Sequence, residues 1–498
     1  MHLDYIYNFE IQFRSMKIIN LILRDFRCFN KFEIEFSADH NLHVIIAENM
    51  VGKTGLLAAL RLAANTYTSG LKVERQISKT DHRIIGSNPI SDQSPDISIE
   101  ATVIMKSSRN KTVESTFLKY KNKQFGERTK IEILKGLDPR KESRLISKLV
   151  AERKAVQPLL SFIGTEYIHV ESSDTVTWEI SGNSVDGYKG CFEDKSIKKF
   201  LFKWLGRMDS LIAEISRKPI MAEQYQEIPR NAVKVFQNAV KSILPDIKEI
   251  EWNSDLKQPI VKLTNGEVRQ FDVLSDGYRY LILLAGELAT RSFILNKHLG
   301  DSVLDKIHGM VIIDEFGIHL HPSLQNQALQ NLQKTFPEVQ FIISTHSPLL
   351  INGLKREQVH IIQITGDNQR VSSHPDEDII GLGANQILTD VFGLKTTMDN
   401  QFQDWNDKYT VLFNKKMKSD LDPSDESQFL ELSRKLAPLR LDPLLKLVPD
   451  DPVVNMIKQR IESKSNEIIM AKSDIESQEN IESRVDTIID EIFKKIEK

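Results

Sequence analysis

The sequence predicts an α/β fold with a mixed sheet, in which a parallel core is joined by a lobe of antiparallel strands. Three short and almost wholly apolar runs indicate the parallel core, because strands covered on both faces carry few polar residues. These runs are Leu42–Ile46, Gly309–Ile313 and Val339–Ile343. Alternation across 97–135 indicates the antiparallel strands, and helical periodicity across 140–245 indicates a compact, mostly helical insert. From about residue 396 the chain is polar, helical in pattern and punctuated by proline, which predicts an α-helical C-terminal region.

The N-terminal part of the predicted core has the order strand, loop, helix. Ile18–Phe36 fits two strands around a turn, Leu42–Ile46 follows as a buried strand, and Gly55–Ala64 fits a helix. Residues 1–15 fit this pattern poorly, whereas Met16 begins it cleanly. We therefore expect Met16 to be the natural start and residues 1–15 to be an extension.

Helices and a hairpin are predicted before the other two apolar strands. Apolar residues recur at helical spacing over Ser196–Ile215 and Arg230–Leu244. Strands are expected at Ile247–Trp252 and Ile260–Leu263, and the Asn265-Gly266 pair that follows is typical of a hairpin turn.

The C-terminal region, residues 396–498, is predicted to serve oligomerisation or partner binding. Asp451-Pro452 favours a helix start, with an aspartate cap and a proline at the first position. An apolar stripe at helical spacing then runs through Ile481, Val485, Ile488, Ile492 and Ile496. The stripe either packs on its own domain or binds a partner or a second copy.

Composition excludes several classes of protein. The chain has 498 residues, of which 40% are hydrophobic, enough for a large core and two or three domains. Its 66 basic and 69 acidic residues give a formal charge of −3, so the whole chain is not a polycationic nucleic-acid binder. Two cysteines exclude a disulfide framework and a cysteine-rich zinc site. Without an apolar run of about 18 residues or a signal pattern, we expect a cytoplasmic protein with no membrane partner.

The first motif is a phosphate loop, residues 47–54, which reads Ala-Glu-Asn-Met-Val-Gly-Lys-Thr. Gly52 would let the backbone approach a phosphate, Lys53 would meet the β- and γ-phosphates, and Thr54 would bind Mg²⁺. Asn49 lies inside the loop and joins the predicted ATP-binding set. Alone, such a loop can be incidental. It also departs from the usual pattern, because alanine replaces the first glycine and Met50 would be strained if its φ were positive.

The second motif is Leu274–Arg279, which reads Leu-Ser-Asp-Gly-Tyr-Arg. It opens a helix predicted over Tyr278–Arg291, so the Ser275 hydroxyl and nearby backbone N–H groups, including that of Gly277, could point at a phosphate. Six residues alone are weak evidence for a phosphate-binding function. The motif becomes informative only together with the other motifs of the chain.

Two further apolar strands are each followed by candidate catalytic residues. Met310–Ile313 ends in Asp314 and Glu315, a pair in which Asp314 would bind Mg²⁺ and Glu315 would polarise the attacking water. The alternative is simple solvation at a strand end. The strand that ends at Ser344 is followed by Thr345 and His346, a candidate contact for the γ-phosphate. The alternative for His346 is a capping or core histidine.

Two tempting metal sites are set aside. His319 and His321 alternate, but the sequence offers no third ligand beside them. Asp376-Glu377-Asp378 follows no strand and is interpreted as a solvated acidic run.

In this order the motifs resemble the ABC-type ATPase heads of the SMC, RecF, long-armed break-repair and overcoming-lysogenization-defect group. The resemblance covers residues 16–395 and implies an ABC-type head as the ATPase domain. Leu274–Arg279, His319–Pro322, Thr345–Pro348 and Gly383–Gly393 resemble more narrowly the PtuA-like ATPases of Septu anti-phage defence, which also occur beside retrons. Asp276 and Phe316 depart from the commoner pattern, and the Q-loop glutamine is unassigned, with Gln76 and the loop near Asp81 as candidates.

The resemblance implies that ATP and Mg²⁺ bind between two copies, so that one protomer's phosphate loop, acidic pair and histidine face Ser275 and Gly277 of the other. Hydrolysis could be fast, slow or regulatory. The implied partners are the chain itself and a separate HNH-type nuclease similar to PtuB, with DNA or retron nucleic acid as further candidates. The alternatives are a PARIS-type ATPase with a Toprim partner and a RecF-like DNA-repair ATPase. A self-contained nuclease and a transporter ATPase are disfavoured.

Overall fold

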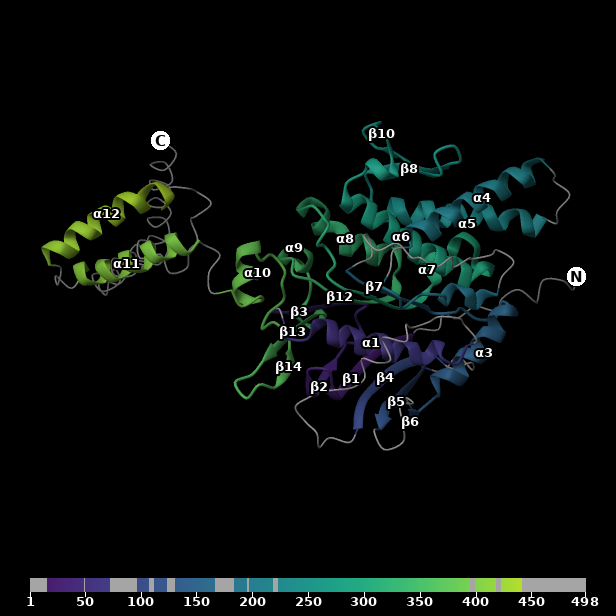
Figure 1. Ribbon diagram of the computed structural model, residues 1–498, viewed down its shortest axis with the longest axis horizontal. Coiled ribbons are helices and arrows are strands. Elements are labelled where there is room, and N and C mark those ends of the chain that lie inside the picture. Colours follow the sequence, from purple (N-terminus) through teal and green to yellow (C-terminus); the bar gives the residue numbers. More distant parts are fainter. Residues whose placement is uncertain are drawn as a thin grey trace, which may run out of the picture. The chain divides into compact units, whose positions relative to one another are not determined.

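The computed structural model describes residues 16–48, 50–71, 96–106, 112–122, 130–165, 183–194, 197–217, 223–394, 399–417 and 422–440. The chain divides into two compact units, Met1–Lys395 and Thr396–Lys498 (Figure 1). Several predictions lie outside the described residues. These are the extension 1–15, Asn49, Gln76, Asp81, Asp451-Pro452 and the stripe from Ile481 to Ile496.

A six-stranded sheet in the order β14-β13-β3-β12-β11-β7 forms the centre of the first unit. The five strands from β13 to β7 run parallel to one another, and within this sheet β14 at the edge is antiparallel. The three predicted apolar strands are β3, β12 and β11, and all lie side by side in this core, as expected for strands covered on both faces. The bounds are β3 Leu42–Ala47, β7 Leu159–Ile163, β11 His308–Ile313, β12 Glu338–Ser344, β13 Val359–Ile364 and β14 Arg370–Ser373.

An antiparallel five-stranded sheet, β2-β1-β4-β5-β6, forms the predicted lobe. Its bounds are β1 Met16–Phe26, β2 Phe29–Glu35, β4 Asp96–Lys106, β5 Thr112–Asn122 and β6 Lys130–Lys135. Helix α1, Lys53–Thr68, lies between the two sheets and contacts β3 and β11 of one and β1 and β4 of the other (Figure 1). Because both sides of α1 are covered, nearly all of its residues are buried, which explains its alanine- and leucine-rich sequence. The helix is longer than the predicted Gly55–Ala64.

Helices cover the opposite face of the parallel sheet, with a small sheet β10-β9-β8 beyond them (Figure 1). The hairpin turn predicted at Asn265-Gly266 joins β9 to β10. Helix α3, Pro139–Ala151, instead packs beside α1. The other helices of the unit are α4 Lys198–Arg217, α5 Glu223–Ile243, α6 Asp276–Leu295, α7 Val303–Lys306, α8 Pro322–Thr335, α9 Pro348–Ile351 and α10 Ala384–Asp390. The small sheet has β8 Ile247–Asn253, β9 Gln258–Leu263 and β10 Val268–Gln270. Short 3-10 turns lie at Ser184–Tyr188, Phe271–Val273, Lys297–Ser302 and Arg356–Gln358.

Strands β7, β13 and β14 were not predicted, and β7 contradicts a prediction of helix. Within the stretch 140–245 that helical periodicity marks as mostly helical, Leu159–Ile163 forms β7 and pairs in parallel with β11. Five consecutive buried apolar residues do not distinguish a strand from a buried helical turn by periodicity. Its pairing partner lies about 150 residues away along the chain (Ile163 opposite Ile313), so only the tertiary fold decides the element.

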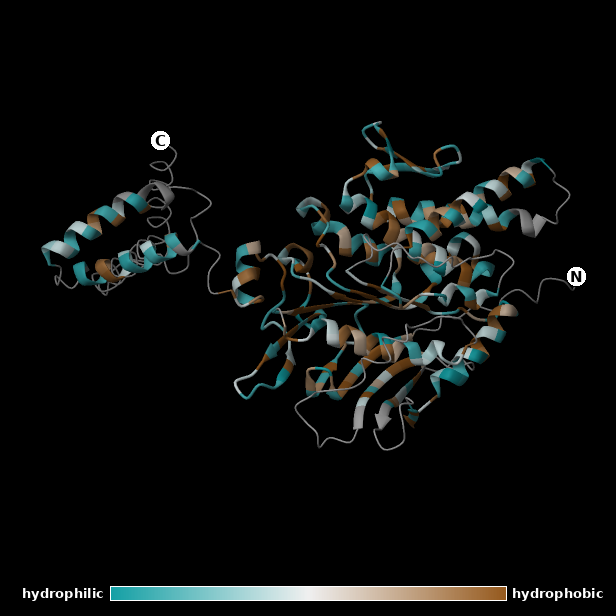
Figure 2. Cartoon of the chain, viewed as in Figure 1, coloured by the Kyte–Doolittle hydropathy of each residue, from teal (hydrophilic) through white to brown (hydrophobic). Residues whose placement is uncertain are grey.

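The second unit contains a helical pair, α11 Asn400–Met417 and α12 Pro423–Arg440. Their contact is apolar and aromatic, with Tyr409 stacked on Phe429 at a centroid distance of 5.1 Å. The buried set is Tyr409, Leu412, Phe429, Leu432 and Leu436. Figure 2 shows the contrast between apolar strands at the centre of the first unit and polar helix faces at its periphery. Across the described ranges, no helix has the length and apolar character needed to cross a membrane.

Candidate active site

The parallel order of β3, β12 and β11 brings three motifs to one edge of the sheet. Ile45 pairs with Ser344, and Ile343 pairs with Ile313, so these strands end almost level with one another. The phosphate loop follows β3, the acidic pair follows β11, and His346 follows β12. The carboxyl edge of a parallel sheet is the usual place for a ligand, which makes this edge the candidate active site.

Lys53 lies at the centre of this site and is buried. Its Nζ donates to the carbonyl oxygen of Ala47 at 3.2 Å and contacts Nε2 of His346. Burial lowers the pKa of Lys53, while the nearby carboxylates of Glu315 and Asp314 act in the opposite direction. Burial, and then the charge of Lys53, lowers the pKa of His346, so the imidazole is neutral and accepts from the ammonium.

The turn before α1 needs glycine at position 52 for two separate reasons. Gly52 has φ of 125°, and a Cβ there would lie 2.7 Å from Cys28 Sγ and 2.9 Å from Phe29 Cζ. Met50 has φ of 69° and is 95% exposed. It therefore adopts the left-handed backbone for which many phosphate loops use glycine, and the strain foreseen for this position is present.

Two arginines that the motifs did not reveal hold the phosphate loop from outside. Arg370 of β14 donates from Nε to the carbonyl oxygen of Val51 at 2.7 Å. Arg27, in the turn between β1 and β2, donates to the carbonyl oxygen of Thr54 at 3.2 Å. The Thr54 side chain itself is on an exposed residue, free to face a ligand. A sheet-edge arginine gives no sequence signal of its own, because its partner is a backbone atom far away in the chain.

The acidic pair is built around the buried hydroxyl of Ser344. Ser344 Oγ donates to Asp314 Oδ1 at 2.5 Å and accepts from the Glu315 N–H at 2.7 Å. Burial raises the pKa of Asp314, with a smaller contribution from neighbouring Glu315, while the Ser344 hydrogen bond and Lys53 lower it. Glu315 has φ of 50°, a left-handed backbone at a non-glycine residue, which is typical of functional positions.

Ser275 and Gly277 lie at the start of α6. Ser275 is the exposed N-cap residue of α6, which begins two residues before the predicted Tyr278. Within the described part of the chain, its hydroxyl makes no capping bond to its own helix. A Cβ at Gly277 would lie 2.9 Å from the carbonyl oxygen of His319, so glycine allows α6 to approach the loop after the acidic pair.

The two rejected metal sites have other roles. His321 Nδ1 accepts from the Ser323 N–H and caps α8, and His319 packs its ring near Tyr280. Among the residues that the structure describes, no group of three or more His, Cys, Asp or Glu side chains is placed to hold a metal. In the acidic run, Asp378 accepts from the Arg356 N–H at 2.9 Å and the three residues are exposed.

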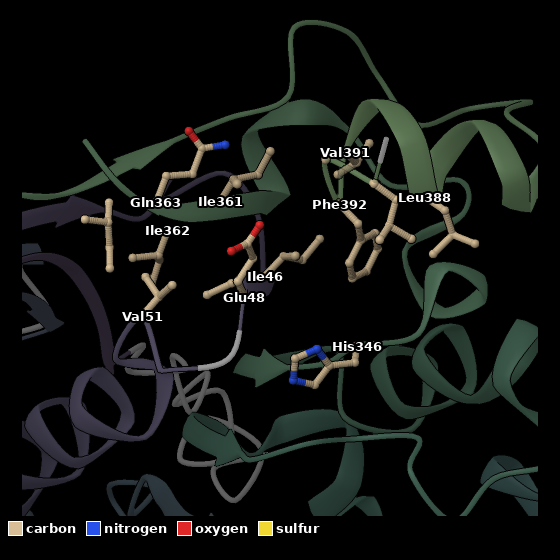
Figure 3. Close-up of a pocket in the computed structure, with 14 residues that line it drawn as sticks. Ile46, Glu48, Val51, His346, Ile361, Ile362, Gln363, Leu388, Val391 and Phe392 are labelled. Carbon is tan, nitrogen blue, oxygen red and sulfur yellow. The ribbon is translucent and has the colours of Figure 1, made fainter. Parts of the chain in front are cut away.

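A cavity of about 700 Å³ adjoins the phosphate loop on its β13 side. Figure 3 shows Ile46 and Glu48 from the loop side, Ile361 and Ile362 from β13, and His346 facing this space. Its remaining wall is formed by α10 and the turn after it, through Leu388, Val391 and Phe392. The segment Gly383–Gly393, singled out only as a pattern, thus lies against the candidate active site.

A phosphate loop, an acidic pair and a histidine on one edge of a buried parallel sheet define a P-loop ATPase. Residues 16–351 match the model of the AAA ATPase domain family, and the chain belongs to this family. The protein is an ATPase.

The curated relatives include retron and Septu proteins. The "Retron Vc95 probable ATPase" of Vibrio cholerae serotype O1 biovar El Tor is 26% identical over 70% of this chain and 74% of its own length. "Septu protein PtuA" of Bacillus thuringiensis is 25% identical over 42% of this chain. "Septu protein PtuA" of Bacillus mycoides (strain KBAB4) is 30% identical over 36% of it. These two matches span 49% and 24% of the PtuA chains. The predicted relationship to PtuA is confirmed.

Solved structures with a similar fold include an SMC head domain from Thermotoga maritima, at 13% identity and a TM-score of 0.38. A recombination mediator protein RecF has 12% identity and a TM-score of 0.37. Each match covers 72% of this chain and 98% of the other.

Proposed function

We propose that this chain is the ATPase subunit of a bacterial anti-phage defence complex, in which ATP-dependent assembly of several copies controls a separate nuclease. The observation that carries the ATP-dependent part is the contact of Lys53 with His346 beside Asp314 and Glu315. The defence role is supported by the relatives named as Septu PtuA and retron ATPases. The partner is expected to be an HNH-type nuclease similar to PtuB.

The site fits ATP and Mg²⁺ on its own geometry. Among the described residues, the hydrogen-bond partners of the buried Lys53 ammonium are a carbonyl and an imidazole, both neutral, so a phosphate oxygen would be a better partner. Glycine at position 52 permits the φ of 125° with which the loop turns into α1, and the backbone N–H groups at the start of a helix suit a phosphate. Thr54 and Asp314 would hold Mg²⁺, which supplies positive charge to the phosphate oxygens.

Each protein group then has a distinct task. Lys53 neutralises phosphate charge, and a neutral His346 gives up its contact with Lys53 to donate to the same phosphate. Glu315, whose N–H is fixed by Ser344, accepts a proton from the attacking water. Ser275 and Gly277 complete the site from a second copy, which makes assembly part of the mechanism rather than a consequence of it.

Glu315→Gln tests the assembly model. The amide cannot take a proton from water, so this variant is expected to retain ATP and to elute as a larger species in gel filtration with ATP and Mg²⁺. Ser275→Ala in the same background should abolish the larger species while one protomer still binds ATP. Unchanged ATP retention and unchanged size in Glu315→Gln would contradict the model.

We further propose that residues 396–498 hold the partner. Deleting 481–498 is expected to abolish capture of a co-expressed HNH nuclease and to leave ATP binding intact. Capture of a Toprim protein instead would favour a PARIS-type complex, and ATP-gated binding of duplex DNA without a nuclease would favour a RecF-like repair role.

A further inference from the structure

One glutamine side chain joins the two loops that flank the catalytic groups. Gln325, near the start of α8, is half-buried. Its Nε2 donates to the carbonyl oxygens of Gly317 at 2.9 Å and Leu320 at 3.0 Å. Its Oε1 accepts from Ser347 Oγ at 2.6 Å. The orientation of the amide follows from chemistry, because two carbonyl oxygens require the NH₂ group.

The first loop, residues 316–320, follows Glu315 directly. Phe316 anchors it in the core at 1% exposure, whereas Ile318 at its tip is 66% exposed. Gly317 has φ of 99°, and a Cβ there would lie 2.4 Å from Leu350 Cδ1, so this close packing of the loop on α9 requires glycine. The two carbonyls that Gln325 holds, those of Gly317 and Leu320, flank the exposed tip, so a contact at the tip acts on residues next to this link.

The second loop, residues 345–347, carries His346 at its centre. Thr345 Oγ1 donates to the carbonyl oxygen of Phe316 at 2.8 Å and accepts from the Ser347 N–H at 3.1 Å. Ser347 is then held by Gln325 through its hydroxyl. Both neighbours of His346 are thus tied to the 316–320 loop. A cavity of about 200 Å³ is lined by Glu315, Gln325, His346 and Ser347 together.

We propose that Gln325 is a positioning residue that couples the 316–320 loop to the placement of His346 and Glu315. This coupling role rests on the proposed function, in which the 316–320 loop meets a second copy across the ATP site. Contact with the loop is transmitted through the Gln325 amide to Ser347, and so to the histidine that faces the phosphate. Catalysis then depends on the shape of the 316–320 loop, with Gln325 and Ser347 acting through Glu315 and His346.

Three variants separate the two ends of this link. Gln325→Ala removes all three hydrogen bonds, Gln325→Glu keeps only the acceptor for Ser347, and Ser347→Ala removes only the bond to the histidine loop. Gln330→Ala, an exposed glutamine of the same helix, is the matched control. A mispositioned catalytic group costs rate rather than substrate affinity, so we expect kcat to fall on the order of tenfold in Gln325→Ala and Gln325→Glu. The ATP Kd should stay within about twofold.

The coupling itself is read from a double-mutant cycle on kcat. Adding Ser347→Ala to Gln325→Ala should lower kcat no further, because the hydrogen bond between Ser347 and Gln325 is already absent. Additive losses, or a kcat equal to that of Gln330→Ala, would overturn the proposal. If circular dichroism shows that Gln325→Ala does not fold, Ser347→Ala and Gln325→Glu replace it. The expected result is the same: kcat falls and the ATP Kd stays nearly constant.

Glu315→Gln keeps this outcome separate from that of the proposed function. If Glu315→Gln neither retains ATP nor assembles, the proposed assembly fails whatever Gln325 does. If Glu315→Gln assembles with ATP but the Gln325 variants keep wild-type kcat, only the coupling through Gln325 is refuted.

Discussion

Removing one buried hydroxyl, in Ser344→Ala, is expected to impair the ATPase through the acidic pair rather than through the phosphate loop. Ser344 is completely buried at the end of β12. It donates to Asp314 Oδ1 and accepts from the Glu315 N–H, so alanine takes a partner from a carboxylate and another from a backbone amide. Both affected residues are assigned to the chemistry.

The size of the effect follows from these two bonds. A hydrogen bond to a charged group contributes about 1.5–3 kcal/mol, and a buried donor left without a partner costs about 1–3 kcal/mol. The free energy of unfolding should therefore fall by at least about 2.5 kcal/mol, the sum of the two lower limits. Loss of the bond also removes a group that lowers the pKa of Asp314, so this pKa, already raised by burial, rises further.

The sign of the pH dependence follows from the ionised form of Asp314, which is the form that would bind Mg²⁺. Activity is lost as the pH falls through the pKa of this carboxyl, and in Ser344→Ala the loss begins at higher pH. The free energy of unfolding also depends on pH through this carboxyl. Because the folded chain holds this proton more tightly than the unfolded chain, stability falls as the pH rises between the ordinary aspartate value and the folded pKa, and the variant widens that interval upward.

The assay is kcat against pH from about 5 to 8 at saturating Mg²⁺, with thermal unfolding measured alongside. Ser292→Ala is the control, because Ser292 is equally buried but donates only to the Leu288 carbonyl of its own helix. We expect the acid limb to move in Ser344→Ala and not in Ser292→Ala. An unmoved limb with kcat within about twofold of wild type, or the same shift in both variants, would refute the reasoning.

Three further substitutions test the phosphate loop, the arginine that holds it and a buried lysine of the antiparallel sheet. Met50→Gly should raise the free energy of unfolding by about 0.5–1 kcal/mol, since it relieves a left-handed backbone at an exposed side chain; a lower melting temperature would contradict this. Arg370→Gln should weaken ATP binding severalfold in a titration, because the phosphate loop loses the bond at the Val51 carbonyl, and an unchanged Kd would argue against the arginine as a brace. Lys119→Met should stabilise the fold below pH 8, because burial lowers the pKa of Lys119 to about 8; the gain should shrink as the pH rises toward 10, where the unfolded lysine also loses its proton, and a pH-independent difference would refute the assignment.

The parts of the site that sequence could predict are those set by local pattern. A strand, a glycine-lysine loop and a helix follow one another along the chain, and Asp314, Glu315 and His346 each follow a buried apolar run. A shared site for these residues was implied by the resemblance to ABC-type heads, and the parallel pairing of β3, β12 and β11 explains why the strand ends meet at one edge.

The parts that escaped prediction depend on partners that are remote along the chain. Ser344 is an ordinary serine until β12 lies beside β11, and Arg370 reaches a backbone carbonyl 319 residues before it. Likewise β7 is a strand only because β11 pairs with it. The positive φ of Glu315 could not be predicted from the sequence either, because a positive φ is expected at glycine and this position is a glutamate.

The arrangement of one protomer itself argues for a site completed from outside. Lys53, Asp314, Glu315 and His346 lie together through contacts or direct electrostatic influence on one another. Ser275 instead heads α6, where Gly277 packs against the backbone of the 316–320 loop rather than against the phosphate loop. An exposed N-cap serine whose hydroxyl is not used by its own helix suits an anion, and the positive end of the 20-residue α6 favours the same ligand. We infer that this anion is the phosphate of ATP on a second copy. The same contact would then place the 316–320 loop, and through Gln325 the histidine of its own site, under the control of assembly.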